Sequence, residues 1–501
     1  MEAWHDSPTK SKERHFRKRA DQLLKGQQEG SAERIKSDVY YSLSPIYHMS
    51  KFCGLLPVKF SQDKSGKYHG RLDLPQVVYG YALLAACLGA QSWGLYRDLR
   101  NGWQNSTRLS SETAITVTCS DVLAVISIIV VVEVGSPSRW KYLQDALNKI
   151  VDIDEKLDVV TSKHLRKASI VVIAVTFFYL FTISTLDFAA WTVSSSTKNI
   201  QGDTDKTPIN YSPLYFMYII IMTFEIQYAL VLFNVGERFL KLNKTIENLT
   251  KTNTIIEYIR KDMGLAVTDT RRELTQSVSF LSTDMGQSKL RRSNKVSDFI
   301  VSAEGSGGSS DAINQLTTLH GMLCDIVINV NKAYGSAILM GTISCLIHLV
   351  ITPYFLYNEI YSPNSSSWYV LWMQVLWIVF HVYRLLLLVQ PCYMVSVKAR
   401  MTGALVSQAL ATKWNPEATK QLEIFSIQLL QRPIEFTACG LFYLDRGLVT
   451  SIVGSVTTYL VILVQFQNAD DTKGTKHLLQ NATELLRNAS SFKNFSSLKN
   501  L

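Results

Sequence analysis

Seven long apolar stretches constrain this chain of 501 residues more than any other feature of its sequence. Each has about 20 residues and at most two ionisable side chains, which suits the roughly 30 Å hydrocarbon core of a bilayer. Inside lipid the backbone must satisfy its own hydrogen bonds, so such stretches fold as helices. The sequence therefore predicts an all-α fold with seven transmembrane helices, at residues 74–96, 114–132, 169–191, 214–235, 333–356, 368–389 and 448–467.

The basic residues predict the orientation of these helices. One side of the predicted membrane carries 39 of the 51 Lys and Arg residues, in segments 1–73, 136–169, 237–332 and 391–434, and the other side carries 10. Because Lys and Arg accumulate in cytoplasmic loops, the N-terminus is predicted to be cytoplasmic and the C-terminus extracellular. Six possible N-glycosylation triplets lie in segments predicted outside, at Asn105, Asn210, Asn364, Asn481, Asn488 and Asn494.

The segments between the spans have distinct characters. Residues 44–60 are apolar but too short to cross the bilayer, and we expect them to lie at the inner membrane surface. Helical periodicity continues from the fourth, fifth and sixth spans into the cytoplasm, including a stripe of Leu316, Leu319, Leu323 and Val327, and predicts a cytoplasmic helical anchor bundle.

The predicted division of the chain follows from these characters. It has a basic disordered tail at 1–43, four spans with a cytoplasmic extension at 44–263, a flexible insertion at 264–312, two spans with anchor helices at 313–432, a seventh span at 433–468 and an extracellular tail at 469–501.

Charge, cysteine spacing and the absence of repeats argue against several other classes of protein. The net charge of +10 follows the predicted topology, so no nucleic-acid partner is expected. No two of the seven cysteines have metal-ligand spacing, and no cluster of His, Asp or Cys typical of an enzyme appears, so we expect neither an enzyme nor a cofactor. The absence of internal duplication and of Gly/Pro-broken spans argues against a transporter, which stays open as an alternative.

Polar and aromatic side chains within the spans predict a ligand pocket. An ionisable group inside a membrane normally faces the protein interior or water. Five spans offer such faces, and the candidate ligand-binding residues are Thr118, Asp121, Ser184, Asp187, Trp191, Tyr218, Glu225, His348, Thr352, Gln374 and Trp377. Aromatic rings with convergent hydrogen-bonding groups suit sugars, so the predicted cavity opens outward and takes a sugar.

The alternative is that these groups only bond one another. His381 and Arg384 share one face of the sixth span with Gln374 and Trp377, and lie deeper. We expect them to be structural partners of Glu225 rather than ligand contacts.

The seventh span is uncharged and rich in small and hydroxylated residues, with Thr458 and Tyr459 in its middle and Gln465 and Phe466 at its outer end. Such a helix could line an ion pathway that an apolar side chain gates by dewetting. Tight packing of small residues explains the pattern equally well.

The C-terminal part of the chain resembles a known family. The segment from Arg432 through Pro433 to Asp445, followed by Thr458-Tyr459, five apolar-leaning positions and Gln465-Phe466, is similar to the signature of insect gustatory receptors. The segment 319–325 before the fifth span resembles the same family, and the resemblance covers about 40–468. Within the family, the seventh-span region and the long cytoplasmic insertion are most similar to the fructose-receptor type.

This resemblance implies a taste receptor of the plasma membrane that acts as a ligand-gated, non-selective cation channel for Na⁺, K⁺ and Ca²⁺. It implies a homotetramer embedded in the lipid bilayer around a central pore lined by the seventh helices, with co-receptor subunits as an open possibility. The ligand pocket would lie among helices two to six, with a sugar, fructose above all, as the ligand. Thr458, Tyr459, Gln465 and Phe466 would fall on the pore helix, the last two near the gate. A receptor for a non-sugar, bitter-type ligand remains the alternative.

The topology can be tested directly. We expect an epitope tag placed after Leu501 to be stained by antibody on intact cells, because an odd number of spans separates it from the basic, cytoplasmic N-terminus. A tag before Met1 serves as the control and should stain only after permeabilisation. Staining of the C-terminal tag only in permeabilised cells would contradict the predicted orientation.

Overall fold

The computed structural model describes residues 39–62, 68–100, 112–157, 163–198, 207–263, 308–361 and 368–466, and the protein is mostly helical. The helices are α2 (Val39–Phe52), α3 (Leu74–Arg100), α4 (Glu112–Val134), α5 (Ser136–Leu157), α6 (Lys163–Lys198), α7 (Thr207–Asn210), α8 (Ser212–Met263), α12 (Gly308–Ile360), α13 (Trp368–Leu410) and α14 (Pro416–Gln431), followed by a final helix, Arg446–Phe466, which we call the C-terminal helix.

Two short antiparallel hairpins correct the all-α prediction. Strand β1 (Val58–Gln62) pairs with β2 (Tyr68–Leu72), and β3 (Thr437–Ala438) pairs with β4 (Phe442–Tyr443). The expected surface segment 44–60 is thus divided between α2 and β1. Helix α2 packs against α6 and α8, and Ile46, Leu55 and Val58 of this segment are buried, so much of it is covered by the bundle.

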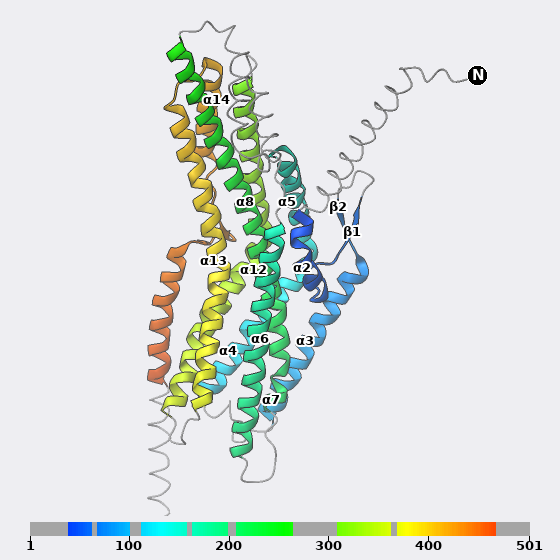
Figure 1. Ribbon diagram of the computed structural model, residues 1–501. Coiled ribbons are helices and arrows are strands. Elements are labelled where there is room, and N and C mark those ends of the chain that lie inside the picture. Colours follow the sequence, from blue (N-terminus) through cyan, green and yellow to red (C-terminus); the bar gives the residue numbers. More distant parts are fainter. Residues whose placement is uncertain are drawn as a thin grey trace, which may run out of the picture.

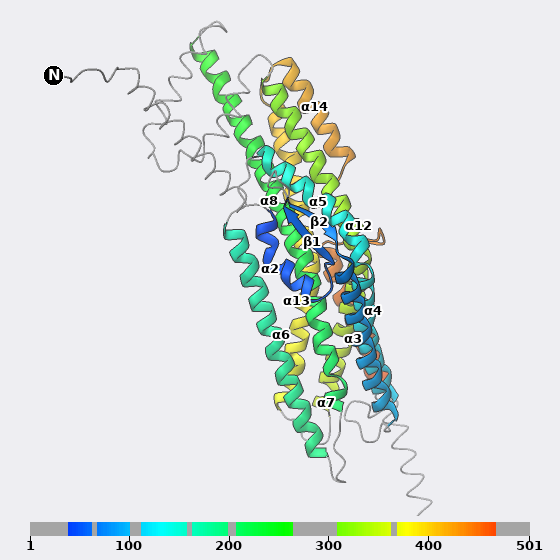
Figure 2. The same ribbon diagram turned by 90° about the vertical axis from the view of Figure 1, so that its right-hand side faces the viewer.

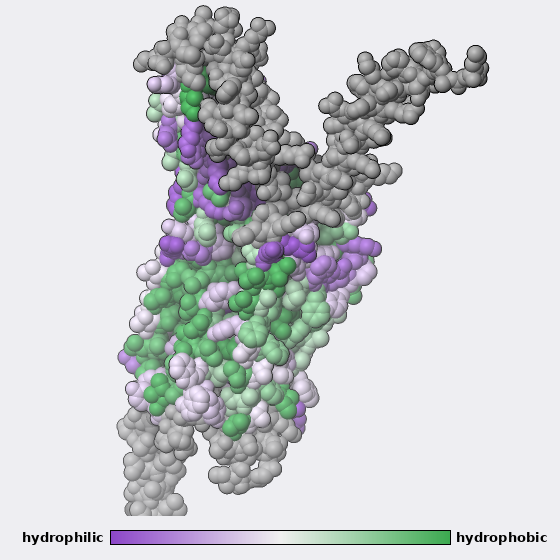
Figure 3. All heavy atoms as spheres, viewed as in Figure 1, coloured by the Kyte–Doolittle hydropathy of each residue, from purple (hydrophilic) through white to green (hydrophobic). Residues whose placement is uncertain are grey.

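The long helices run side by side along the length of the molecule (Figures 1 and 2). In Figure 3 the hydrophobic side chains gather in a belt over the lower half of the molecule, and hydrophilic side chains dominate above it. Helices α8, α12 and α13 extend from the belt into this upper part, where α14 packs against α12 and α13. This arrangement matches the helical bundle predicted next to the spans.

Six helices of the described residues are long and apolar enough to cross a membrane: α4, α6, α8, α12, α13 and the C-terminal helix. Helix α3, the predicted first span, has the length but is not among them, because its glycines, glutamines and tyrosines reduce its hydropathy. The first span therefore stays a prediction. The tails and most of the predicted insertion lie outside the described residues, although α12 begins at Gly308, earlier than the predicted boundary at 313.

The apolar stripe predicted on the helix that leads into the fifth span is confirmed. Leu316, Leu319, Leu323 and Val327 are all at most 2% exposed, and they face the neighbouring helices of the bundle. The helical spacing of these apolar residues therefore predicted correctly which face of α12 is buried in the hydrophilic end of the bundle.

One predicted glycosylation residue is not on the surface. Asn210 is 5% exposed, and its side-chain nitrogen donates to Asp98 Oδ1 of α3 at 3.2 Å. This hydrogen bond links α7 to α3 and occupies the side-chain nitrogen to which a glycan would be attached. Of the six sequons predicted outside, this one is a poor acceptor, and the others lie outside the described residues.

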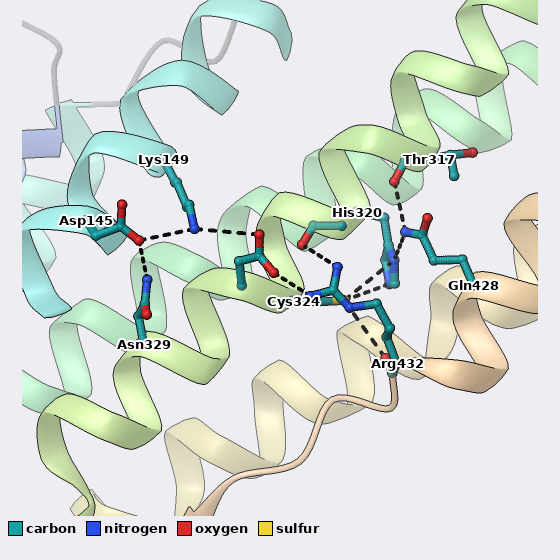
Figure 4. Close-up of polar contacts among 10 residues, drawn as sticks. Asp145, Lys149, Thr317, His320, Cys324, Asn329, Gln428 and Arg432 are labelled. Atoms are coloured by element: carbon teal, nitrogen blue, oxygen red, sulfur yellow. Dashed lines mark hydrogen bonds and ion pairs between the residues drawn. The ribbon is translucent and has the colours of Figure 1, made fainter.

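A polar network ties α5, α12 and α14 together (Figure 4). Lys149 of α5 lies 3.1 Å from Asp145 and 3.5 Å from Asp325 of α12, and Asp325 in turn pairs with Arg432 just after α14. Gln428 of α14 donates to the carbonyl of Thr317 at 3.0 Å. Because Arg432 begins the segment that leads to the C-terminal helix, this network links that helix to the rest of the bundle.

Candidate functional site

A fully buried ion pair lies at the base of the candidate site. Glu225 of α8 and Arg384 of α13 are both inaccessible to solvent, and Arg384 Nη2 donates to Glu225 Oε1 at 2.8 Å. The Nε–H group of Arg384 also points at the same carboxylate, at 3.2 and 3.3 Å. The expected partnership of Glu225 with Arg384 is confirmed, so this carboxylate contributes to the site mainly by holding α8 and α13 together.

Aromatic rings cluster around Tyr218 of α8, two turns from Glu225. Its ring lies 5.3 Å from that of Trp377, 6.0 Å from His348 and 6.1 Å from His381. The imidazoles of His348 and His381 stack at 4.5 Å, and the Arg384 guanidinium lies 5.8 Å from the Tyr218 ring. Spans from α8, α12 and α13 therefore meet in one aromatic and cationic cluster.

Two carboxylates attach further helices to this cluster. Asp121 of α4 lies 3.1 Å from His348 Nε2. Asp187 of α6 accepts a hydrogen bond from the Tyr215 hydroxyl at 2.8 Å, and the Tyr215 ring stacks on Trp377 at 6.5 Å. Side chains from α4, α6, α8, α12 and α13 thus meet in one connected cluster, and its role in ligand binding stays a prediction.

The structure brings together most of the predicted ligand-binding residues. Asp121, Asp187, Tyr218, Glu225, His348 and Trp377 form the connected cluster. Thr118 and Thr352 are buried on α4 and α12, Ser184 and Gln374 are half-buried on α6 and α13, and Trp191 packs against Tyr211 at 6.0 Å.

Sequence reasoning missed Tyr215 and Phe380. Tyr215 lies three residues before Tyr218 on the same face of α8, a spacing that could have identified it. Phe380 packs edge-on against Tyr218 at 5.7 Å, but an apolar residue inside an apolar span gave no signal.

Some buried polar atoms of this cluster find no partner among the described residues. They are His381 Nδ1 and Arg384 Nη1. A buried donor or acceptor without a partner costs free energy, about 1–3 kcal/mol. The cluster therefore offers unused hydrogen-bonding groups next to aromatic faces, which is the chemistry that a polyhydroxylated ligand requires.

The C-terminal helix stands at the edge of the bundle, and little of it is buried against the rest of the chain (Figure 1). Tyr459 and Phe466 are 53% and 61% exposed, and Thr458 and Gln465 are exposed as well. Its contact with the bundle includes Leu460 and Leu463, which pack against a small cluster of Val117, Ile351 and Tyr354. The hydroxyl of Thr458 donates to the carbonyl of Gly454 at 3.1 Å, so this polar side chain is satisfied within the helix.

Comparison with known proteins identifies the family. The model of the 7tm chemosensory receptor family matches residues 43–470. The chain belongs to this family. The resemblance to insect gustatory receptors is therefore confirmed, and the chain is a multi-pass membrane protein.

Individual relatives support the same assignment. The chain is 28% identical over 433 residues to the gustatory receptor for sugar taste 43a of Drosophila melanogaster, which covers 85% of this chain and 98% of that one. It is 30% identical over 172 residues to the putative gustatory receptor 28a of the same fly, covering 32% and 37% of the two chains. The insect olfactory receptor OR5 from Machilis hrabei shares the fold with a TM-score of 0.53 at 13% identity, over 85% of this chain and 97% of that one.

The buried ion pair generates a prediction about stability. We expect Arg384→Met to abolish most surface expression, because it leaves the Glu225 carboxylate charged and unpaired in an apolar interior, at a cost of about 3–5 kcal/mol. The double variant Glu225→Leu with Arg384→Met removes both charges and should recover a substantial part of the expression. Surface biotinylation measures both.

The matched control is Lys251→Met, which breaks the exposed pair between Lys251 and Glu247 on the same helix as Glu225. Exposed pairs contribute little, so expression should stay near that of the unchanged receptor. Normal expression of Arg384→Met alone would show that the pair does not hold α8 and α13 together.

Proposed function

We propose that this chemosensory receptor is a subunit of a taste receptor channel in the plasma membrane, opened by a sugar that binds the cluster around Tyr218 and Trp377. The observation that carries the proposal is the combination of aromatic faces with unpartnered buried groups, His381 Nδ1 and Arg384 Nη1, in the middle of the spans. Rings cover the apolar C–H face of a sugar, while polar groups bind its hydroxyls.

The relative with sugar taste in its name supports the choice of ligand, since it aligns over nearly its whole length. Fructose is the sugar that the resemblance of the signature segment favours. Asp121 and Asp187, held near the cluster by His348 and Tyr215, are the carboxylates best placed to accept hydrogen bonds from hydroxyls.

The exposed C-terminal helix supports a channel made of several copies. A helix of 21 residues that buries little against its own chain has a face available to other subunits. Four copies placing this helix at a shared axis would enclose a pore for Na⁺, K⁺ and Ca²⁺, with the exposed Thr458 and Tyr459 on its wall and Gln465 and Phe466 near its outer end.

The ligand site can be tested by whole-cell current recording with a panel of sugars on cells that express this chain alone. We expect Trp377→Ala and Asp187→Ala to shift the sugar dose–response curve by roughly ten- to a hundredfold, since each removes a contact worth about 1–3 kcal/mol. Surface expression should remain.

The control is Trp372→Ala, which removes an exposed tryptophan from the same helix. Its dose–response curve should not change. Unchanged curves for both Trp377→Ala and Asp187→Ala would show that the cluster is structural and does not bind the ligand. Responses to bitter compounds without responses to sugars would show that the ligand is a bitter compound.

The gate can be tested at Phe466, which we place at the apolar constriction. Replacing Phe466 with Ser should let water enter the constriction and produce current without ligand, because hydrated cations cannot pass an apolar ring. Gln465→Ala should instead reduce the maximal response while the ligand still binds.

The control is Phe181→Ser, at a phenylalanine of α6 that is 72% exposed and lies outside the proposed pore helix. It should produce no leak. If Phe466→Ser reaches the surface, shows no leak and keeps its ligand response, the gate lies elsewhere in the chain.

A further inference from the structure

A cavity lies between α2, α5 and α8, and none of the residues of the aromatic cluster around Tyr218 lines it. Its volume is about 340 Å³, near the lower end of the roughly 300–1,000 Å³ of small-molecule sites. Most of its wall is apolar, formed by side chains that include Leu43, Ile46, Leu143, Leu147 and Val231. Neither the proposed sugar site nor the proposed pore uses it.

The cavity lies at one end of the apolar belt. Helix α2, which supplies much of its wall, lies where the belt of Figure 3 gives way to hydrophilic side chains, on the same side as α5 and the extensions of α8 and α12 (Figures 1 and 3). Tyr40, Tyr41, Tyr47 and Trp140 line it. Tyrosine and tryptophan concentrate at the level of lipid headgroups, because their rings are apolar at one end and polar at the other.

A cation marks the rim of the cavity. The guanidinium of Arg166, near the start of α6, lies 4.1 Å from the centre of the Tyr41 ring, and Tyr41 lines the cavity. Its Nε–H group is buried and has no partner among the described residues. This side chain therefore places an unused charged donor beside an apolar cavity.

The wall also holds two polar side chains whose buried atoms are unused. Trp140 and Gln227 are 2% and 4% exposed, and within the described chain neither Trp140 Nε1 nor Gln227 Oε1 has a hydrogen-bond partner. An indole N–H can donate to an ester carbonyl, and an amide oxygen can accept from a hydroxyl or ammonium group. An occupant with both apolar and polar parts would satisfy them, whereas a purely apolar molecule would not.

We propose that this cavity binds one acyl chain of an acidic membrane phospholipid, with its phosphate at Arg166. The apolar wall takes the chain, the tyrosines and Trp140 lie at the level of the glycerol esters, and the guanidinium binds the phosphate as a charge-assisted partner. The half-buried Tyr41, Ser44 and Tyr47 leave the cavity accessible along α2. Anionic lipids are concentrated in the cytoplasmic leaflet, where the basic loops of this chain are predicted to lie.

Such a lipid would act on the receptor through α5. Leu143 and Leu147 of α5 contact the cavity, and Asp145 and Lys149 of the same helix bond Asn329 and Asp325 of α12. An occupied cavity would fix the position of α5 between α2 and α8, and thereby its contacts with α12.

Photolabelling of the full-length receptor tests the proposal. The receptor is placed in vesicles that contain phosphatidylserine or phosphatidylcholine with a photoreactive group on one acyl chain, and labelled peptides are mapped by mass spectrometry. We expect phosphatidylserine to label α2 and α5 several-fold more strongly than phosphatidylcholine. Leu143→Trp and, independently, Ser44→Phe fill the cavity and should each reduce this labelling several-fold.

Matched variants separate occupancy from general effects. Leu123→Trp adds the same side chain at an exposed position of α4, and should leave labelling of α2 and α5 unchanged. Arg166→Gln should remove the preference for phosphatidylserine, whereas Lys167→Gln, at the exposed neighbouring residue, should keep it. Each variant is checked for its elution volume in gel filtration and its thermal stability. If one of the cavity-filling variants, Leu143→Trp or Ser44→Phe, is misfolded, the other one provides the test.

The outcomes decide the proposal. Labelling of α2 and α5 that neither filler reduces would show that no lipid chain occupies the cavity. Equal labelling by both lipids, unaffected by Arg166→Gln, would overturn the assignment to acidic phospholipids. Because the readout is a labelled peptide, a failure here is independent of whether a sugar opens the channel.

Discussion

The pairing of Glu225 with Arg384 is the interaction on which the rest of the structure depends. Both charges lie within helices that are apolar enough to span a membrane, and neither is exposed, so each must meet the other or pay a large desolvation cost. That requirement selects which face of α8 meets which face of α13.

Tyr218 lies seven residues before Glu225 and Trp377 seven residues before Arg384, about two helical turns in each case. The ion pair therefore brings Tyr218 to Trp377, and the aromatic cluster is its geometric consequence.

The same register continues toward the hydrophilic end. Asn243 and Thr402 are hydrogen-bonded at 2.7 Å with a sequence separation of 159, the separation that also joins Glu225 to Arg384. A constant separation means that α8 and α13 run in the same direction without slipping over this length. Two parallel helices must be joined by a connection that returns, and α12 supplies it, packing against both. The parallel pair thus fixes α12 as the helix that runs from the aromatic cluster to the hydrophilic end of the bundle.

Features of the fold and of the candidate site could be predicted where residues close together in the sequence form a recognisable pattern. The leucine stripe from Leu316 to Val327 was read correctly, because a helix that buries one face repeats it every three or four residues. The partnership of Glu225 and Arg384 was also predicted, since charges inside apolar spans have few alternatives. The hairpin of β1 and β2 was missed although it is local, because the like charges Lys59 and Arg71 face each other across it and such pairs do not indicate paired strands. The burial of Asn210 was missed for a different reason: its partner Asp98 lies 112 residues earlier on another helix, a contact that no local pattern predicts.

Helix α12 connects the proposed ligand site to the proposed pore. It is 53 residues long, carries His348 in the aromatic cluster, and carries Asp325, the partner of Arg432, at its hydrophilic end. Between them, Gly335 lies so close to the turn at Cys439 that an added Cβ would come within 3.3 Å of the Cys439 nitrogen.

Cys439 and Gly440 have positive φ angles of 53° and 75°, so this turn between β3 and β4 has a specific conformation and sits directly before the C-terminal helix. In the proposed channel, a ligand that shifts His348 along or around the axis of α12 would also move the contacts at Gly335 and Asp325, because all three residues lie on one continuous helix. The segment from Arg432 to Asp445 touches α12 at both points, so such a change would have two contacts through which to reach the C-terminal helix, besides the covalent chain.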